Sequence, residues 1–398
     1  MQAKSACRIG ATFRTDGRVK TFLVGGAVRD RLLGIEPDER DWVVLGATPA
    51  EMEALGFRRL DTDFPVFAHP DSGEEYALAR REKKSGEGHK GFVVEFGPEV
   101  TLEEDLRRRD LRVNAMAESA EGELVDPVGG LGDLNKRVLR HVSPAFVEDP
   151  LRVLRCARLA ARLAGYGFQI DPSTRALMKK MSAGEDMHAL SGGRIWRELE
   201  KALRTESPAT FFSELETCGA LPVVLPELAP AGRRDGTSLD FSVLDIAAGL
   251  DPRPEIRFAT LVNARTGVDP VATVEILDRL GQRFPLPRKY AELARMVPLV
   301  YTFPSENPDA AALYAMLESV DAFRRAERFT DALAVCDALD QWMAGPAQTG
   351  LLRRAFEAAA AVSGDDTVQS GVTGKDAGAE IRRRRIRTIE ESLNLDAC

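Results

Sequence analysis

Residues 23–46 constrain the fold of this chain more than any other stretch. They read LVGGAVRDRLLGIEPDERDWVVLG, which predicts an apolar strand ending at Val24, a turn at Gly25 and Gly26, a helix from Ala27 and a second strand over residues 41–45. Glycines between a strand and a helix leave backbone N–H groups open to an anion, because no Cβ blocks the approach. The turn therefore indicates a phosphate site, although a plain strand-to-helix connection also explains an isolated Gly-Gly pair.

Acidic residues gather directly before the second strand. Asp38, Glu39 and Asp41 lead into it, and a strand period of two places Glu39 and Asp41 on one face. Two carboxylates beside a phosphate site can hold magnesium against a nucleoside triphosphate. Glu75, in a strand expected over residues 74–80, supplies a third carboxylate if that strand neighbours the strand of Asp41. The alternative for Glu75 is an exposed acidic residue at a strand start.

The bulk properties describe a globular chain with several domains. Its 398 residues correspond to about two to four domains, and a hydrophobic content of 44% provides each with a core. The five cysteines show no Cys-x-x-Cys spacing, so neither a zinc site nor a disulfide framework is indicated, and a reducing cytoplasm fits. No apolar run reaches membrane-spanning length, and residues 1–20 are expected to form a loose tail without the core of a signal peptide. The net charge of −8 argues against indiscriminate nucleic-acid binding, while local basic faces can still contact phosphates.

The next segments are short elements with charged residues. Thr48 and Pro49 indicate the start of a short helix over residues 49–56. Residues 80–97 are polar, basic and rich in glycine, and we expect a loop there. Residues 102–117 predict one helix that carries Arg109, Asp110 and Asn114. Arginine side chains suit triphosphate oxygens and an aspartate can orient one of them, although a charged run can also be a solvated helix face.

From residue 144 onwards the pattern is helical, with no clear strand. Asp149 and Pro150 predict the start of a long helix. Asp149 and Arg152 are three positions apart, so their side chains can converge, and an acceptor beside a donor can pair with the edge of a nucleobase. The alternative is a helix-capping carboxylate and a solvated arginine. A basic stripe follows one side of the helix: Arg152, Arg155, Arg158 and Arg162.

In order, type and spacing, these segments resemble those of the class II tRNA nucleotidyltransferases, the CCA-adding enzymes of bacteria. The resemblance extends from Phe22 to the end of the chain and is closest up to Glu198. Residues 25–30 are similar to the family's triphosphate turn, and Asp41 stands at its second metal-binding aspartate. Glu75 looks like the third carboxylate, and residues 80–97 resemble the flexible loop.

The later segments carry the rest of the resemblance. Residues 108–115, RRDLRVNA, are similar to the family's ribose- and phosphate-binding motif. Residues 148–152, EDPLR, resemble the amino-acid template in which the aspartate and the arginine select CTP and then ATP. Arg194 and Glu198 resemble the motif that steadies the neck helices.

The resemblance implies a fold class and a division into domains. The fold class is an α+β N-terminal nucleotidyltransferase head, with a small mixed sheet and helices, followed by an all-α neck, body and tail. The implied domains are a head over residues 20–141, a neck with the base-reading helix over 142–210, a helical body over 211–290 and a helical tRNA-binding tail over 291–398. The tail includes Arg382, Arg383, Arg384, Arg385 and Arg387.

The resemblance also implies an activity and its residues. The activity is addition of C, C and A to the 3′ end of tRNA without a nucleic-acid template, from CTP and ATP, with Mg²⁺ as cofactor and release of pyrophosphate. The partner is tRNA, contacted at its acceptor and T arms. The implied catalytic carboxylates are Glu39, Asp41 and Glu75, of which Glu39 and Asp41 are the metal ligands. The implied nucleotide-binding residues are Gly26, Arg29, Arg109, Asp110, Asn114, Asp149, Arg152, Arg155 and Arg158.

Three departures from the family pattern are visible. The family's metal motif is Asp-x-Asp, but here Glu39 takes the first position, and its extra methylene moves the carboxylate outward by about 1.5 Å, where misplacement by about 1 Å can cost a hundredfold in rate. Gly193 stands where the neck motif usually has glutamate. No histidine follows His188, so the ligands of the His-Asp phosphohydrolase module that similar proteobacterial enzymes carry are missing.

The sequence leaves several alternatives open. A poly(A) polymerase of the same superfamily shares the head chemistry, although a more basic chain with a longer basic tail would be expected. A partial enzyme that adds only CC or only A fits the same motifs, and a tRNA-binding paralogue with impaired catalysis fits Glu39 and Gly193. The oligomeric state is also left open.

Overall fold

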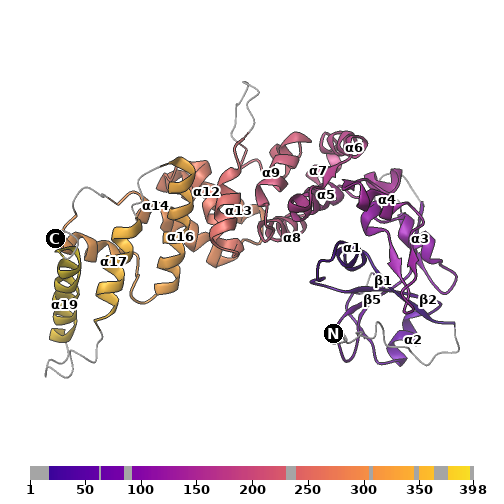
Figure 1. Ribbon diagram of the computed structural model, residues 1–398, viewed down its shortest axis with the longest axis horizontal. Helices are drawn as coiled ribbons and strands as arrows, with labels where there is room; N and C mark the ends of the chain where they lie inside the picture. Colours follow the sequence, from indigo (N-terminus) through magenta and orange to yellow (C-terminus); the bar gives the residue numbers. More distant parts are fainter. Residues whose placement is uncertain are drawn as a thin grey trace, which may run out of the picture. The chain divides into compact units, whose positions relative to one another are not determined.

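The computed structural model describes residues 18–61, 64–84, 92–229, 239–303, 308–344, 349–362 and 375–394 (Figure 1). The chain forms two compact units, residues 1–187 and 188–398. Among the described residues no helix is both long and apolar enough to cross a membrane. The described cysteines, Cys156, Cys218 and Cys336, are buried, and none of the three forms a disulfide bond.

The first unit is built on a seven-stranded sheet. Its strands lie in the order β3-β4-β5-β2-β1-β8-β9. The central β2 pairs antiparallel with β1 and parallel with β5, so the sheet is mixed, as predicted for the head. The strands are β1 (Lys20–Val24), β2 (Asp41–Leu45), β3 (Arg58–Arg59), β4 (Val66–Ala68), β5 (Glu75–Leu78), β8 (Ala117–Glu118) and β9 (Leu124–Val125).

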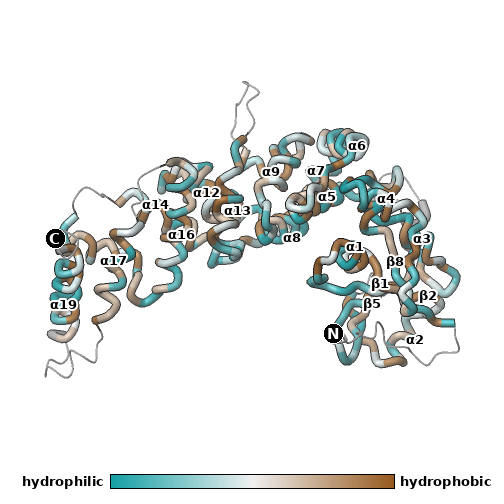
Figure 2. Tube along the Cα trace, in the orientation of Figure 1, coloured by the Kyte–Doolittle hydropathy of each residue, from teal (hydrophilic) through white to brown (hydrophobic). Residues whose placement is uncertain are grey.

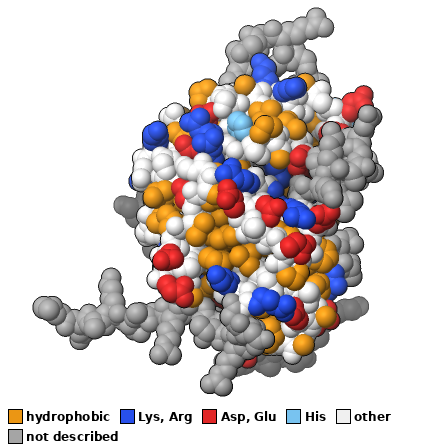
Figure 3. Space-filling model, turned by 90° about the vertical axis from the view of Figure 1, so that its right-hand side faces the viewer, with side chains coloured by type: hydrophobic (Ala, Val, Ile, Leu, Met, Phe, Trp, Pro, Cys, Tyr) orange, Lys and Arg blue, Asp and Glu red, His pale blue; other side chains and the backbone are white. Residues whose placement is uncertain are grey.

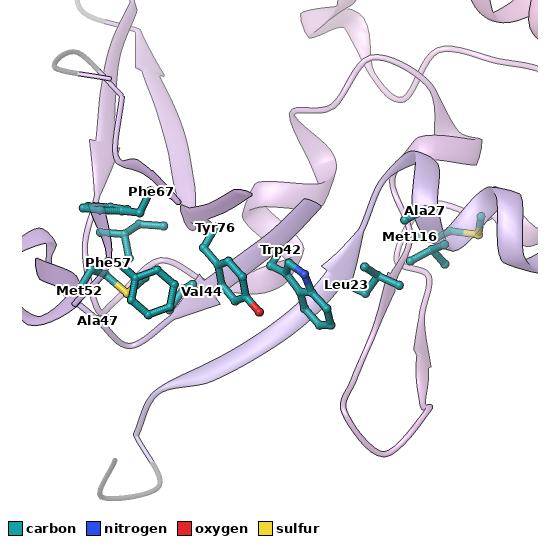
Figure 4. Packing of buried hydrophobic residues seen from close by; sticks show 12 residues of the cluster. Leu23, Ala27, Trp42, Val44, Ala47, Met52, Phe57, Phe67, Tyr76 and Met116 are labelled. Carbon is teal, nitrogen blue, oxygen red and sulfur yellow. The ribbon is translucent and has the colours of Figure 1, made fainter. Parts of the chain in front are cut away.

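Both faces of this sheet are buried, because neighbouring residues of a strand point to opposite sides. One core cluster contains Trp42 and Val44, and the other contains Val43. The Trp42 and Tyr76 rings stack with centroids 5.5 Å apart, and Figure 4 shows them in line with Phe57 along the sheet. With both faces packed, the strand ends remain for polar chemistry.

Residues 102–117 do not form the single helix that their sequence predicts. They form α3 (Leu102–Arg107), the 3-10 helix η1 (Arg112–Asn114) and the start of β8. The helix ends because Asp110 turns its carboxylate back to accept the N–H of Leu111, which is extended and bridges to His141. Local charge spacing predicted the helix, and these tertiary contacts override it.

Residues 80–97 are also more regular than predicted. β6 (Arg80–Lys84) and β7 (Phe92–Phe96) form a separate antiparallel ladder, so the expectation of a plain loop was wrong at both ends. Arg81 and Glu95 lie opposite each other, and their side chains pair at 3.0 Å. Such cross-strand pairs stabilise a hairpin. Residues 85–91 lie outside the described part of the chain.

Helices between and after the strands complete the first unit. They include α1 (Gly26–Leu33), α2 (Pro49–Ala54), α4 (Gly130–Asn135), η2 (Pro144–Glu148), α5 (Leu151–Leu163), η3 (Ala164–Tyr166) and α6 (Pro172–Ser182), and α7 (Glu185–His188) spans the unit boundary. A two-residue strand, β11 (Gln169–Ile170), pairs parallel with β10 (Val138–Leu139). The expectation of no strand after residue 144 therefore fails at this one place.

The second unit is helical throughout the residues described in it, as predicted. Figure 2 shows apolar and polar residues alternating along these helices, which is the pattern of helices packed on one side. Its aromatic core joins Trp196, Phe258 and Tyr290. The helices are α8 (Gly192–Leu203), α9 (Pro208–Thr217), α10 (Leu221–Val224), α11 (Ser242–Leu250), α12 (Pro254–Thr266), α13 (Pro270–Arg283), α14 (Arg288–Tyr301), α15 (Ala310–Ser319), α16 (Ala326–Met343), α17 (Thr349–Ala360) and α19 (Lys375–Asn394).

Candidate active site

The glycine turn lies between two guanidinium groups. Gly25 has φ of 72°, a left-handed conformation that glycine adopts without strain, and α1 begins at Gly26. A Cβ built on Gly25 would lie 3.1 Å from Nη1 of Arg109, and one on Gly26 would lie 3.4 Å from Nη2 of Arg29. Backbone N–H groups of a helix start and two arginines therefore converge on one small region, which suits a phosphate group.

Arg29 is fixed in the protein interior. Its side chain is buried, and it donates through Nε at 2.8 Å and Nη2 at 2.6 Å to Oδ1 of Asp30. Its Nη1 donates to Oδ1 of Asn114 at 2.6 Å. Burial lowers the pKa of Arg29, Asp30 opposes that shift, and the nearby charges of Arg162 and Arg158 add to the lowering. Arg158 therefore belongs to the same cluster of positive charge.

Asp105 orients Arg109, and sequence reasoning missed it. Its carboxylate is buried, with Oδ1 accepting from Arg108 and Oδ2 accepting from Nε and Nη2 of Arg109 at 3.3 and 3.1 Å. Oδ1 also accepts the backbone N–H of Arg80 at the start of β6. Burial alone raises the pKa of Asp105, but Arg109 and Arg108 outweigh it, so the pKa is lowered. Its spacing of three and four residues from these arginines was the available signal.

Asp110 joins η1 to α5. Its buried carboxylate accepts Nε of Arg155 at 2.7 Å, the N–H of Leu111 at 2.8 Å and Nδ2 of Asn114 at 3.4 Å. Burial works to raise the pKa of Asp110, but the charge and hydrogen bond of Arg155 hold it well below the usual range of an aspartate. Asn114 connects this carboxylate to Arg29, so Asp110 and Asn114 form one network with Arg29 and Arg155.

The start of α5 holds Asp149 and Arg152. α5 begins at Leu151 with Pro150 as its N-cap, so the prediction of Asp149 as N-cap was wrong by one position, although Oδ1 of Asp149 accepts the N–H of Leu151 at 3.0 Å. Arg152 is buried, and it donates Nη1 to the carbonyl of Ala145 at 2.7 Å and Nη2 to the carbonyl of Arg108 at 3.0 Å. The alternative of a solvated arginine is therefore wrong.

The predicted carboxylates lie at the other side of the site. Asp41 and Glu75 are direct partners in the register of the parallel strands β2 and β5, which meets the condition set for Glu75 as a third carboxylate. Both are exposed, as is Glu39. Because β2 begins at Asp41, a strand period does not extend to Glu39, and the earlier argument for a shared face does not hold.

This donor set fits a cation that arrives with phosphate. In the described part of the chain no group of three or more His, Cys, Asp or Glu residues could hold a metal ion by itself. Mg²⁺ is characteristically bound through one or two carboxylates together with substrate phosphates and water, and carboxylate oxygens are the ligands it prefers. On the face that Figure 3 shows, basic and acidic side chains are interspersed.

The neck motif lies on α8, in the second unit. Arg194 and Glu198 are one helical turn apart, and Glu198 is buried. A Cβ on Gly193 would have no atom within 4 Å, so the structure leaves room for the glutamate that relatives carry. A Cβ on Gly192 would instead lie 1.8 Å from the carbonyl oxygen of Arg283, so glycine is required one position earlier.

Comparison with known proteins agrees with this fold. Residues 21–140 match the family model described as the Poly A polymerase head domain, and residues 167–231 match the one described as a probable RNA and SrmB-binding site of polymerase A. The chain is 44% identical over 404 residues to the multifunctional CCA protein of Thioalkalivibrio sulfidiphilus, covering 94% of this chain and 98% of that protein.

Solved structures show the same fold. A CCA-adding enzyme of Thermotoga maritima complexed with tRNA aligns with a TM-score of 0.63 at 21% identity, over 95% of this chain and 92% of that one. The Bacillus stearothermophilus CCA-adding enzyme in complex with CTP aligns with a TM-score of 0.62 at 23% identity, over 94% and 89%. The head-domain match and the 44% identical relative show that this protein is a nucleotidyltransferase. The chain belongs to the family of CCA-adding tRNA nucleotidyltransferases.

Proposed function

We propose that this protein adds C, C and A to the 3′ end of tRNA from CTP and ATP, and that the head residues described above carry out the reaction. The observation that supports it most is the arrangement around the Gly25-Gly26 turn. Two arginines converge there, while Asp41 and Glu75 lie side by side at the starts of adjacent strands. This is a site for a triphosphate on one side and for a hydroxyl nucleophile on the other.

The arginine side binds the phosphates and the ribose. The N–H groups at Gly26 and the guanidinium groups of Arg29 and Arg109 bind triphosphate oxygens, and their fixed hydrogen bonds mean that little reorganisation is needed when the nucleotide arrives. Asp110 and Asn114 bind the ribose through the polar edges that their internal contacts leave available.

Asp149 and Arg152 read the base. The two hydrogen bonds from Arg152 to backbone carbonyls use two of the five N–H donors of a guanidinium, and they hold its plane in place. An acceptor from Asp149 and a donor from Arg152 then match the edge of cytosine or adenine without a nucleic-acid template. Arg155 connects this helix to the phosphate-binding residues through Asp110. Arg158 adds positive charge near Arg29, and both Arg155 and Arg158 are proposed to bind the nucleotide.

Glu39 and Asp41 are the proposed ligands of Mg²⁺, with Glu75 as the third carboxylate of the site. With the triphosphate bound, one Mg²⁺ held by these residues would lower the pKa of the tRNA 3′-hydroxyl, and a second would stabilise the negative charge of the leaving pyrophosphate. The protein positions the reacting groups and keeps acidic oxygens on the side where the hydroxyl arrives. The chemistry and the exposure of these three carboxylates support this assignment.

The second unit provides the proposed tRNA contacts. Within α19, Arg382, Arg383 and Arg387 are exposed, so they can contact backbone phosphates of the acceptor and T arms. Arg385 is used internally, because it lies 4.0 Å from the ring centroid of Phe323. The proposed domains are a head over residues 20–141, a neck over 142–210, a body over 211–290 and a tail over 291–398. The proposed location is the cytoplasm.

We do not expect a phosphohydrolase activity in the second unit. Residues 189–398 contain no histidine, so the imidazole ligands of such a centre are missing. Metal-dependent release of phosphate from 2′,3′-cyclic phosphates by the purified protein would contradict this expectation.

Sequencing of tRNA 3′ ends tests the main proposal. Purified protein is incubated with tRNA that lacks its terminal CCA, with CTP, with ATP or with both. We expect CC from CTP alone and CCA from both nucleotides. Long A tracts from ATP alone would indicate a poly(A) polymerase, and a product limited to CC or to a single A would indicate a partial enzyme. Binding of tRNA without incorporation would indicate a paralogue with impaired catalysis.

A further inference from the structure

The segment between α1 and β2 carries Glu39 and is held by few contacts. At its start the N–H of Ile35 donates to the carbonyl of Asp30 at 2.8 Å. Arg40 forms two longer ion pairs, at 3.6 Å with Glu36 and at 4.0 Å with Glu74. A shorter side-chain contact joins this segment to α5, where Asp38 accepts Nη1 of Arg162 at 2.7 Å. The residue directly before Glu39 is therefore attached to α5.

Arg162 is itself held in place from the interior. Its Nη2 donates to Oδ2 of Asp30 at 3.0 Å, and the Asp30 side chain is 4% exposed. The other oxygen of Asp30 accepts Arg29. Because Asp30 joins the two arginines, the guanidinium of Arg162 has a fixed direction and presents Nη1 to Asp38. A planar fork that bridges two carboxylates is geometry that a lysine ammonium cannot reproduce.

We propose that Arg162 is a positioning residue for the metal-binding carboxylates. Asp38 and Glu39 are adjacent and both exposed, so either could approach a cation beside Asp41. Arg162 neutralises Asp38 and holds it toward α5, which leaves Glu39 to accompany Asp41. The same helix begins with Asp149 and Arg152, so one rigid element fixes both the base-reading pair and the segment of Glu39. This inference rests on the proposed metal role of Glu39 and Asp41.

Two measurements that do not depend on turnover test it in Arg162→Met. The first is Mn²⁺ binding, as a substitute for Mg²⁺, followed by electron paramagnetic resonance with a non-hydrolysable CTP analogue. We expect binding weaker by about tenfold, because the segment of Glu39 is released and sub-ångström placement governs such sites. The second is hydrogen exchange, which should become faster over residues 35–40 and stay unchanged over α1.

The controls separate positioning from folding. Arg31→Met, which removes an ion pair of 2.9 Å with Glu118 from the same region, should change neither measurement. Arg162→Lys keeps the charge without the fork and should show an intermediate loss of Mn²⁺ binding. Thermal unfolding and tRNA binding of each variant should remain close to those of the unmodified protein, which would show that the fold and the tRNA contacts are intact.

The variant Asp38→Asn tests whether Arg162 influences metal binding through Asp38. If Arg162 acts through Asp38, this variant should weaken Mn²⁺ binding to a similar extent, and the double variant should be no worse than either single one. Unchanged Mn²⁺ binding and exchange in Arg162→Met would overturn the inference. So would stronger binding in Arg162→Met together with loss of binding in Asp38→Asn, because Asp38 would then be the ligand. If the unmodified protein binds no Mn²⁺ and adds no nucleotide, the proposed function fails, while the exchange comparison still tests whether Arg162 fixes the segment.

Discussion

The two sides of the active site are built in opposite ways. On the arginine side, Arg29 and Arg109 are held by buried aspartates, and Asp110 is fixed by Arg155 and Asn114. On the carboxylate side, Glu39, Asp41 and Glu75 are exposed at strand starts. Buried charges need partners at all times, because an unpaired charge in the interior is costly. The carboxylates on the other side lie exposed, where a cation that arrives with the nucleotide can reach them.

Asp41→Ala should have the largest effect of any single change. It removes the exposed carboxylate nearest to Glu75, and we expect incorporation of both C and A to fall by about a thousandfold or more, since metal-dependent charge stabilisation provides several kcal/mol. Binding of tRNA should survive, because the proposed tRNA contacts lie mainly outside the head. Single-turnover incorporation and a filter-binding assay measure the two effects. Equal loss of tRNA binding would mean that the two sides of the site are not separable.

Deletion of residues 85–90 should abolish the addition of A and leave the addition of C intact. The deleted residues lie outside the described part of the chain, between β6 and β7. At the start of β6 the N–H of Arg80 donates to Asp105, which also holds Arg109 on the arginine side. We expect CC addition to continue and the final A to be lost, because this segment is proposed to reposition the base-reading pair between the two nucleotides. Product lengths on a sequencing gel would show it. Equal loss of C and A incorporation would reduce the segment to a connector.

Asp110→Asn should lower the stability of the arginine side in a pH-dependent way. The folded-state pKa of Asp110 is lowered, so its ionised form stabilises the protein above the ordinary aspartate pKa, and this contribution is lost as the pH falls below about 4. At pH 7 we expect the variant to unfold with a free energy lower by about 2 kcal/mol, the usual contribution of a hydrogen bond to a charged group. Urea unfolding at pH 7 and pH 3.5 tests this, since the difference between variant and unmodified protein should shrink in acid. A constant difference would contradict the proposed role of the charge.

The same contrast explains how far the sequence could predict the molecule. Features set by neighbouring residues were predictable: Thr48 and Pro49 indicated α2, which has a full capping box with Glu51, and the Gly25 turn was found where expected. The prediction that Glu75 lies beside Asp41 needed one assumption, that their strands are neighbours in the sheet. The parallel register of β2 and β5 confirms it.

Features set by distant contacts could not be read locally. Asp105 was passed over as one charge in a run, because its burial depends on packing against the start of β6. The predicted helix over residues 102–117 failed for a similar reason, since Asp110 and Arg112 bond to segments that follow residue 139. In the sequence Arg152 could equally be solvated, and only the carbonyls of Ala145 and Arg108 explain its burial. The contacts on the arginine side of the site were therefore hard to predict from the sequence in detail.

Glu39→Asp should have the smallest effect, and it tests the carboxylate side most finely. Restoring the family's Asp-x-Asp pattern shortens the side chain by about 1.5 Å, enough to change the rate of a site that depends on ångström-scale placement. We expect a change of severalfold in turnover and in the Mg²⁺ concentration needed for half-maximal rate, with nucleotide order unchanged, because Asp149 and Arg152 are not altered. A higher rate would mean that the native site is detuned. A lower rate would mean that the segment held by Arg162 has adapted to glutamate, and Glu39→Asp combined with Arg162→Met should then recover part of the loss. Glu39→Ala with unchanged rate and magnesium dependence would falsify the metal role of Glu39 and leave Asp38 as the partner of Asp41.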